Sequence, residues 1–302
     1  MKLQAFIVTI RWKNVLIIGI MQSVLLFYYV LPYCGWSDNS LISGVMIVLA
    51  TGMVLAAGNI YNDIIDVSAD AIHPSKPSLI GHEVPIKMGR KWTLIINAIS
   101  IFIPLIGWIW LDWDIILLLI FLLTIPTLVI YSHVLKSTVL IGNLVIATLC
   151  ALAIWMTVLT IPGCNLDITL HTSDKTSLIF TGYIFNAFLL TLLREIFNDK
   201  EDAAYDIQMN IRTIGSKGEK TLKWVVNWLL GITMIVNVIW FSNLWDVLST
   251  NFWVIGLIVI LTPLSSIILI YNLFKSNKVY RLLSGLIKLY FICAVILLII
   301  WR

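Results

Sequence analysis

The sequence predicts an all-α, polytopic membrane protein with about nine transmembrane helices in one bundle. Three observations support this fold class. Of the 302 residues, 60% are hydrophobic and only 12% are charged, whereas a soluble domain is usually about half apolar and a quarter charged. The apolar residues form continuous runs of roughly 20 residues, the length of a membrane-spanning helix, rather than the alternating segments of a membrane β-barrel. Basic residues concentrate in alternate connections between these runs.

Nine apolar runs are long enough to cross a bilayer. The first follows a basic stretch, but it is long enough to span, so we interpret it as a transmembrane helix and not as a removed leader. The spans are expected at about residues 14–32, 41–61, 92–111, 115–132, 138–161, 178–194, 223–242, 252–272 and 282–301.

The distribution of lysine and arginine predicts a cytoplasmic N-terminus. With this orientation only Lys175 and Arg302 fall outside and Lys288 falls within the last span, so 17 of the 20 basic residues are cytoplasmic. Such a bias satisfies the positive-inside rule. The odd number of spans then places the C-terminus outside.

Two connections are long and polar, at about residues 62–91 and 194–220, and both are cytoplasmic in this topology. We expect residues 1–302 to form a single transmembrane domain whose function lies in these two loops. The four cysteines lack metal-ligand spacing and are expected to be packing residues. The net charge of +4 reflects basic loops, not nucleic-acid binding.

The two polar connections begin with acidic segments of matched spacing, after the second and the sixth span. In each segment three aspartates stand at i, i+3 and i+7, and a polar residue precedes the first of them by four positions. The residues are Asn59, Asp63, Asp66 and Asp70 in the first segment, and Glu195, Asp199, Asp202 and Asp206 in the second. On a helix, positions i, i+3 and i+7 lie on one face. The shared spacing hints at an internal repeat.

Carboxylates stacked on one helix face repel each other, and at a membrane boundary they are costly unless a positive charge neutralises them. Half of all acidic residues, 8 of 16, fall in these two segments. Mg²⁺ takes oxygen ligands and keeps waters and substrate phosphates in its coordination shell. The pattern therefore indicates two carboxylate clusters that hold a diphosphate through divalent metal ions.

These residues resemble the UbiA superfamily of intramembrane prenyltransferases. Its first motif, Asn-Asp-x-x-Asp-x-x-x-Asp, matches residues 62–70 in full, and its second, Asp-x-x-x-Asp, matches Asp202 and Asp206. The similarity covers the whole chain and includes Tyr131-Ser132, Lys136, Ile141-Gly142-Asn143 and Arg212-Thr213. The resemblance implies Mg²⁺-dependent transfer of a polyprenyl group from its diphosphate to a lipophilic acceptor.

The resemblance also implies roles for individual residues. The metal ligands or their immediate support would be Asn62, Asp63, Asp66, Asp70, Asp199, Asp202 and Asp206. The catalytic residues would be Asp66, Asp70, Asp202, Asp206 and Lys136, the last of which contacts the diphosphate. The substrate-binding residues would be Asn59, Lys76, Tyr131, Lys136, Arg194 and Arg212.

One stretch departs from the family pattern. After the first motif the family often shows Arg-Pro-x-Arg-Pro, whereas this chain has His73-Pro74-Ser75-Lys76-Pro77. Lys76 supplies a positive charge, but as a point charge without the bidentate fork of arginine. We therefore expect diphosphate affinity or lipid choice to differ.

Within the superfamily, the second segment most resembles the branch of ether-lipid assembly, which transfers geranylgeranyl to geranylgeranylglyceryl phosphate. The branches that prenylate hydroxybenzoate or dihydroxynaphthoate in quinone synthesis remain open alternatives. The implied partners are a polyprenyl diphosphate, the lipophilic acceptor and membrane lipid, with no nucleic acid and no protein partner. In a prokaryote the protein would lie in the plasma membrane with its active site facing the cytoplasm.

The expected mechanism rests on leaving-group stabilisation. Metal ions and basic side chains neutralise the departing diphosphate, and the C1–O bond breaks toward an allylic cation in a site that excludes water. Tyr61, Tyr131 and Tyr183 are candidates to face that cation, although packing is the commoner role of such residues. His133 is isolated in the sequence and is expected to be a loop or interface residue.

Three other functions fit the sequence less well. A cation transporter would bury ionisable groups near the bilayer midplane, whereas these carboxylates cluster at one membrane face. A soluble isoprenyl diphosphate synthase would have amphipathic helices, and these are apolar all round. A non-enzymatic scaffold would not need the intact aspartates.

Overall fold

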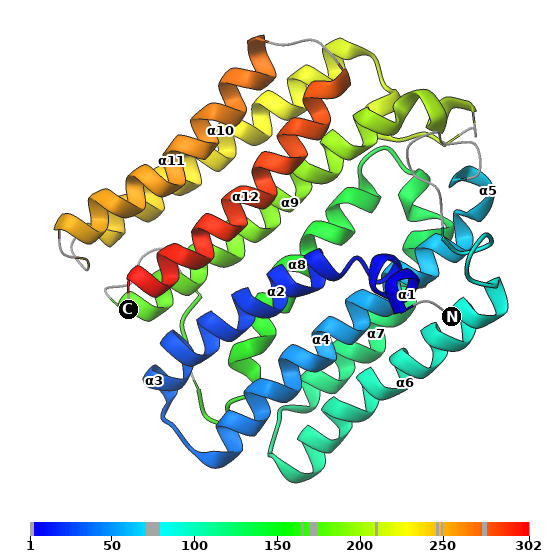
Figure 1. Cartoon of the computed structure of the whole chain (residues 1–302). Helices are drawn as coiled ribbons and strands as arrows, with labels where there is room; N and C mark the ends of the chain where they lie inside the picture. Colours follow the sequence, from blue (N-terminus) through cyan, green and yellow to red (C-terminus); the bar gives the residue numbers. More distant parts are fainter. Residues whose placement is uncertain are drawn as a thin grey trace. The chain divides into compact units, whose positions relative to one another are not determined.

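The computed structural model describes residues 3–70, 79–164, 166–168, 174–208, 211–245, 248, 250–273 and 277–301, and these residues are helical almost throughout (Figure 1). The element η1 is a π-helix, and η2 and η3 are single 3₁₀ turns. The elements are α1 (Leu3–Thr9), α2 (Trp12–Leu25), η1 (Leu26–Val30), α3 (Leu31–Cys34), α4 (Asp38–Ile65), α5 (Val67–Asp70), α6 (Ile86–Trp110), α7 (Ile115–His133), η2 (Leu135–Ser137), α8 (Ile141–Leu159), α9 (Lys175–Gln208), η3 (Ile214–Ser216), α10 (Glu219–Leu244), α11 (Thr250–Leu273) and α12 (Asn277–Ile300).

Nine helices within the described residues are long and apolar enough to cross a membrane. The first of these spans, Trp12–Cys34, is built from α2, η1 and α3 in succession. The predicted all-helical class and the predicted number of spans are therefore confirmed. Each predicted span overlaps one of these helices.

Two helices continue past the predicted ends of their spans into the acidic segments. The second span is predicted to end near residue 61, but α4 continues to Ile65. The sixth is predicted to end at residue 194 with a loop to residue 220, but α9 continues to Gln208. The hydropathy falls at residue 194, yet the residues that follow include alanine, glutamate and lysine, which are good helix formers. Helix α9 therefore continues past the end of its apolar run.

The chain divides into two compact units. The first consists of Met1–Leu26, Cys34–Lys136 and Met156–Cys164, and the second of Phe27–Tyr33, Ser137–Trp155 and Asn165–Arg302. Each unit is described separately below. That the chain acts as a single domain with one bundle stays a prediction.

Helix α4 is the centre of the first unit, where it contacts α2, α6 and α7 (Figure 1). Two hydrogen bonds tie it to its surroundings. The Gln22 amide donates to the Thr51 hydroxyl (3.3 Å), and the Trp113 indole N–H donates to the Ser43 hydroxyl (2.8 Å). Polar contacts of this kind hold membrane helices together, because lipid offers no alternative hydrogen-bond partner.

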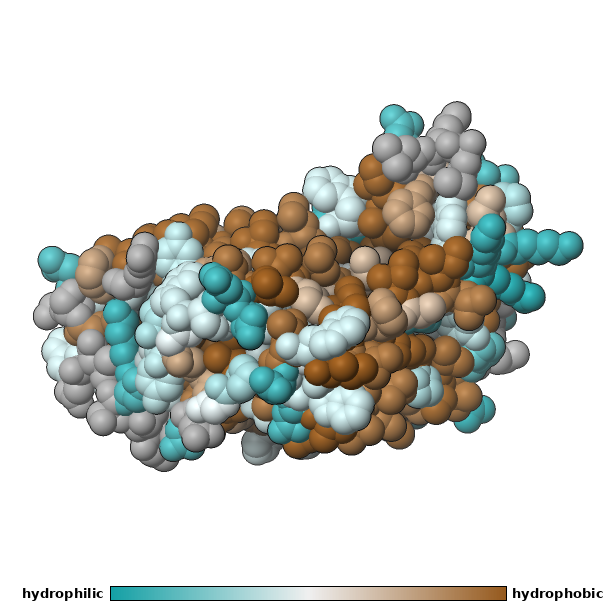
Figure 2. Space-filling view, turned by 90° about the horizontal axis from the view of Figure 1, so that it is seen from below, coloured by the Kyte–Doolittle hydropathy of each residue, from teal (hydrophilic) through white to brown (hydrophobic). Residues whose placement is uncertain are grey.

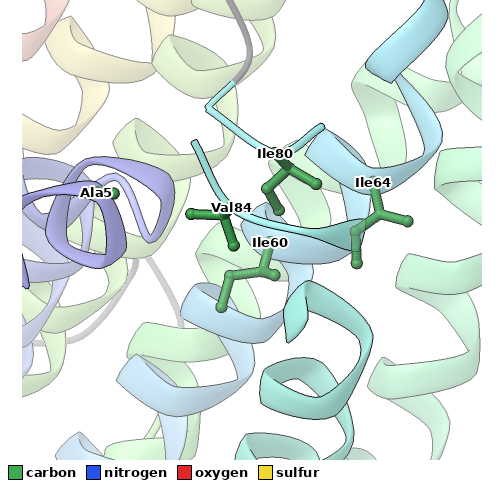
Figure 3. Packing of buried hydrophobic residues seen from close by; sticks show 5 residues of the cluster. All are labelled: Ala5, Ile60, Ile64, Ile80 and Val84. Carbon is green, nitrogen blue, oxygen red and sulfur yellow. The ribbon is translucent and has the colours of Figure 1, made fainter. Parts of the chain in front are cut away.

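The short helix α1 covers the C-terminal end of α4. Ala5 of α1 packs in a buried apolar cluster with Ile60 and Ile64 of α4 and with Ile80 and Val84 of the turn before α6 (Figure 3). Burial of an isoleucine side chain contributes about 1.5–3 kcal/mol. This cluster therefore fixes the end of α4 that carries the first acidic segment.

Helix α9 is the centre of the second unit and contacts α10, α12 and η3 (Figure 1). Asn186 of α9 and Asn237 of α10 exchange amide hydrogen bonds of 3.2 and 3.0 Å. The buried Tyr290 hydroxyl of α12 donates to the Asn186 carbonyl oxygen (3.2 Å). This network fixes the register of three helices in an otherwise apolar interior.

Large apolar side chains are exposed on the spans, and Figure 2 shows broad brown areas formed by such residues. Leu94 on α6 and Leu123 on α7 are 72% and 66% exposed. Apolar surface on this scale is unusual for a soluble monomer. Lipid is the solvent that covers it.

Cys34 and Cys164 form a disulfide whose Cα atoms lie 5.2 Å apart, a separation that suits such a bond. The expectation that all cysteines are packing residues is therefore wrong for this pair. The two residues are 130 positions apart, so no spacing rule applied to the sequence could join them. Among the described cysteines, Cys150 and Cys293 are free thiols and are partly buried, as expected.

The chain after α9 packs back on that helix through Gly215. A Cβ atom at this position would overlap the backbone of Asp199 and Lys200. Only glycine permits so close an approach of two backbones. The adjacent Thr213 and Ile214 are buried, so the loop lies firmly against α9.

We predict that Gly215→Ala lowers the thermal unfolding temperature, because the new methyl group must push the loop away from α9, at a cost of about 1–3 kcal/mol. Gly231→Ala in α10 is the matched control, since no atom lies within 4 Å of the Cβ it would add. Thermal unfolding of both variants in detergent checks this. Equal unfolding temperatures for the two variants would contradict it.

Candidate active site

The first acidic segment lies across the end of α4, and the helix breaks within it. Asp66 is the C-cap of α4, with φ −86° and ψ 1°, and its N–H donates to the Asn62 carbonyl (2.9 Å). A separate short helix, α5, then carries the backbone of Asp70. Asp63 and Asp70 therefore lie on separate helices joined at Asp66, and one shared face for all three aspartates stays a prediction. The Asp70 side chain and Lys76 lie outside the described residues.

Basic side chains neutralise the first segment. The Arg11 guanidinium lies 3.1 Å from the Asp63 carboxylate, and the Lys136 ammonium forms an ion pair with Asp66 Oδ1. The second oxygen of Asp66 accepts a hydrogen bond from the Asn62 amide (2.7 Å). Each of the two carboxylates is therefore already paired with a cation supplied by another part of the chain.

Asn62 has one polar atom without a partner. Its Oδ1 is buried and accepts no hydrogen bond from any described residue. A buried acceptor left unpaired is costly, and a cation would satisfy it. Asn62, Asp63 and Asp66 offer oxygen atoms only, which is the donor set that Mg²⁺ prefers. These residues therefore fit a magnesium ion.

Arg11 contacts the first acidic segment, although in the sequence it is only one of the basic residues before the first span. It adopts a left-handed backbone conformation (φ 52°) between α1 and α2, a strained state for a non-glycine residue. Asn59 donates its amide to the Ile10 carbonyl (3.1 Å), and its role in binding substrate stays a prediction. Both contacts hold the turn between α1 and α2 against the first acidic segment.

The second acidic segment is a continuous part of α9, so its aspartates do lie on one helix face. Asn143 of α8 donates its amide to Asp199 Oδ2 (2.8 Å). The Thr213 hydroxyl donates to Asp206 Oδ2 (3.1 Å). Asp202, which lies between Asp199 and Asp206 in the sequence, is partly buried. Neutral donors thus hold the Asp199 and Asp206 carboxylates on this face of α9.

The other polar residues of this stretch serve packing. Glu201 pairs with Arg281 of α12 (2.7 Å), and Asn198 accepts a hydrogen bond from the Ser284 hydroxyl of α12 (2.8 Å). Positions 198 and 201 are one helical turn apart and form their own row on α9. The segment therefore separates into a row that contacts α12 and a row that presents the aspartates.

Arg194 lies one to two turns before Asp199 along α9. Its guanidinium donates twice to the adjacent Glu195 carboxylate (3.1 and 2.5 Å), and both side chains are largely buried. An ion pair within an apolar span is costly to bury. We therefore keep Arg194 among the candidate residues.

The remaining candidates are placed as follows. Tyr131 lies on α7 and is partly buried, and Arg212 is exposed in the loop before η3. The Tyr61 hydroxyl contacts His133 Nε2 (2.8 Å), so His133 is not isolated. The buried Tyr183 hydroxyl donates to the Ala294 carbonyl (2.5 Å), a packing role.

Within the part of the chain that the structure describes, no three His, Cys, Asp or Glu side chains gather as a metal site. The pairings above give the reason. Asp63 and Asp66 are turned toward Arg11 and Lys136, which act where a divalent ion would otherwise supply the positive charge. Chemically, the site offers carboxylate and amide oxygens for a metal and cations for an anionic substrate.

The sequence matches the UbiA prenyltransferase family over residues 20–292. One relative, the digeranylgeranylglyceryl phosphate synthase of Sulfolobus acidocaldarius, is 25% identical over 96% of this chain and 94% of its own length. The chain spans only 61%, 58% and 62% of the length of three other relatives with the same name.

Two solved structures are similar in fold. One concerns digeranylgeranylglyceryl phosphate synthase in membranes, with TM-score 0.69, 18% identity and 99% and 98% of the two chains covered. The other is a UbiA homolog from Archaeoglobus fulgidus bound to DMAPP and Mg²⁺, with TM-score 0.64, 15% identity and 96% and 98% coverage. Together with the nine spans among the described residues and the two aspartate motifs, the match over residues 20–292 shows that this chain belongs to the UbiA prenyltransferase family.

Proposed function

We propose that this protein catalyses the Mg²⁺-dependent transfer of a polyprenyl group, geranylgeranyl, from its diphosphate to the hydroxyl of geranylgeranylglyceryl phosphate. The observation that carries the proposal is the pair of aspartate motifs with oxygen-only donors, in a chain of this family. The synthase name of the Sulfolobus acidocaldarius relative supports this acceptor, and the Mg²⁺ and DMAPP of the Archaeoglobus fulgidus homolog support the metal and the donor class.

In this proposal Asn62, Asp63 and Asp66 of the first segment, with Asp70, bind Mg²⁺, and Asp199, Asp202 and Asp206 of the second segment also serve as ligands. The buried Asn62 Oδ1, which lacks a partner among the described residues, supports the assignment for the first segment. Bound Mg²⁺ would neutralise the diphosphate oxygens and so stabilise the leaving group. The first segment must exchange its internal cations for the metal before this can happen.

Lys136 is the residue that we assign to the diphosphate. In the structure its ammonium contacts Asp66, so it already lies beside the first segment. A metal bound to Asp66 would free the Lys136 ammonium to bind an anionic phosphate oxygen. Lysine suits this task because it is a compact point charge with three donors. Arg194 and Arg212 are proposed to bind the anionic parts of the substrates.

The bond between C1 and the diphosphate oxygen breaks, which leaves an allylic cation at C1 and releases diphosphate. The acceptor hydroxyl oxygen then bonds to C1 to form the ether, and its proton passes to the released diphosphate. Water must be excluded during this step, because it would capture the cation. The exposed apolar surface of the spans supports a site within reach of lipid. The long prenyl chains of both substrates are most soluble there.

We also propose that the acidic segments face the cytoplasm. The disulfide supports this orientation, because such bonds form in oxidising compartments and are rare in the cytosol. Cys34 precedes α4, and the first segment lies at the other end of this 28-residue helix, about 40 Å away. If the disulfide lies outside, the first acidic segment lies inside. The basic residues of the loops point to the same orientation.

Purified protein with labelled geranylgeranyl diphosphate and Mg²⁺ is predicted to transfer label to geranylgeranylglyceryl phosphate, and EDTA is predicted to stop it. Asp66→Ala and Asp202→Ala should each lower the rate by about 100-fold or more, because each removes a charge that holds the metal. Glu201→Gln is the matched control, since this acidic residue of the same segment contacts Arg281, and it should keep the rate within about threefold.

Parallel reactions receive dihydroxynaphthoate or hydroxybenzoate as acceptor. Label transfer only to an aromatic acceptor would reject the glycerol-phosphate acceptor and keep the metal site. Full activity of Asp66→Ala and Asp202→Ala would reject the metal assignment.

Lys136→Gln is predicted to lower kcat/KM for the prenyl diphosphate by about 10²-fold, because it removes one cation from the developing charge of the leaving group. Lys136→Arg keeps the charge and should recover part of the loss. Lys223→Gln serves as the control, since Lys223 is also ion-paired, with Glu219 at 3.3 Å, but is exposed and lies outside both acidic segments. Steady-state kinetics would contradict the role if the Lys136→Gln and Lys223→Gln variants behaved alike.

In intact cells, a membrane-impermeant phosphine followed by an impermeant maleimide is predicted to label Cys34 and Cys164, in a chain whose other cysteines are replaced by serine. Without the phosphine the label should be absent, because the disulfide protects both thiols. Labelling that requires a permeant reductant and a permeant maleimide would place the disulfide inside and reverse the proposed orientation.

A further inference from the structure

Asn143, near the start of α8, contacts the second acidic segment although it belongs to a different helix. Its side chain is 6% exposed, and its Nδ2 lies 2.8 Å from Asp199 Oδ2. A carboxylate can only accept hydrogen bonds, so the amide must present its N–H₂ group to Asp199. The chemistry of the partner therefore fixes the orientation of the Asn143 amide.

Apart from Asn143, helix α8 (Ile141–Leu159) is mostly apolar. A buried amide in such a helix is destabilising unless it is hydrogen-bonded. The Asp199 contact provides that partner and joins two elements that are 56 positions apart in sequence. The amide does more than fill space, because an apolar side chain of the same size would suit the helix better.

The hydrogen bond restrains the Asp199 carboxylate. It occupies a lone pair of Oδ2, limits rotation of the carboxylate and leaves Oδ1 available to a cation. Groups that hold a metal ligand in this way change metal affinity by about 10- to 100-fold when they are removed, because the ligand loses its orientation.

We infer that Asn143 is a positioning residue that orients Asp199 for the divalent metal. This inference rests on the proposed function, since it assumes that Asp199 is a ligand. Asn143 itself makes no contact with substrate in this account and acts only through Asp199.

The contact between Ser284 and Asn198, the residue before Asp199 on α9, offers a matched control. Ser284 of α12 is also 6% exposed, and its hydroxyl donates to Asn198 Oδ1, also over 2.8 Å. The two contacts thus have equal length and burial and reach adjacent residues of α9. Only the Asn143 contact reaches a proposed metal ligand.

The test measures Mn²⁺ binding to the full chain in detergent by electron paramagnetic resonance, with inorganic diphosphate present and no acceptor. Asn143→Leu, which keeps the size and suits the apolar helix, is expected to weaken Mn²⁺ binding about tenfold or more. Asn143→Ala is expected to do the same, and Ser284→Ala is expected to leave the affinity unchanged. Thermal unfolding of each variant reports whether it folds.

A double variant separates positioning from general packing. In an Asp199→Asn chain the proposed ligand is already lost, so adding Asn143→Leu should change Mn²⁺ affinity less than about twofold. An additional tenfold loss in that background would overturn the inference, as would equal effects of Asn143→Leu and Ser284→Ala. Failure of the unsubstituted protein to bind Mn²⁺ would overturn the proposed function itself, an outcome distinct from tight binding that Asn143→Leu leaves intact.

Discussion

Negative charge at the ends of apolar helices is the constraint on which the rest of this structure depends. A carboxylate at a membrane boundary must be neutralised or hydrogen-bonded. In the first segment, cations from the turn between α1 and α2 and from the turn after α7 do this, through Arg11 and Lys136. In the second, neutral donors do it, through Asn143 and Thr213. The surrounding helices are arranged so that these partners reach the aspartates.

The two acidic segments differ in backbone conformation. Helix α4 ends at Ile65 and the chain turns at Asp66, whereas α9 continues for two more turns past its first aspartate. The apolar cluster of Ala5 in α1 with Ile60 and Ile64 holds the C-terminal end of α4 in place. At α9 the loop with Gly215 and the contacts of Asn198 and Glu201 with α12 have the same effect. A rigid support of this kind is what a metal site requires.

Hydropathy and the positions of the aspartates were enough to predict the helical class, the nine spans and the two acidic segments, because these features are local in sequence. The break at Asp66 was not predictable, since Ile64-Ile65-Asp66-Val67 contains neither glycine nor proline. The Cys34–Cys164 bond and the Asn143–Asp199 contact were also missed, because each joins residues far apart in the chain. The sequence identified Arg11 only as a basic residue before the first span and did not indicate its contact with Asp63. The matched position of Asn143 in the family pattern was the one signal that could have pointed to it.

We propose that the first acidic segment exchanges its internal cations, Arg11 and Lys136, for a metal-bound diphosphate. An experimental structure with Mg²⁺ and a non-hydrolysable prenyl diphosphate analogue tests it most directly. We expect Asn62 Oδ1 and aspartate oxygens at about 2.1 Å from Mg²⁺, with the Lys136 ammonium on a phosphate oxygen instead of on Asp66. An analogue bound elsewhere, with the Arg11–Asp63 and Lys136–Asp66 pairs still intact, would contradict the account.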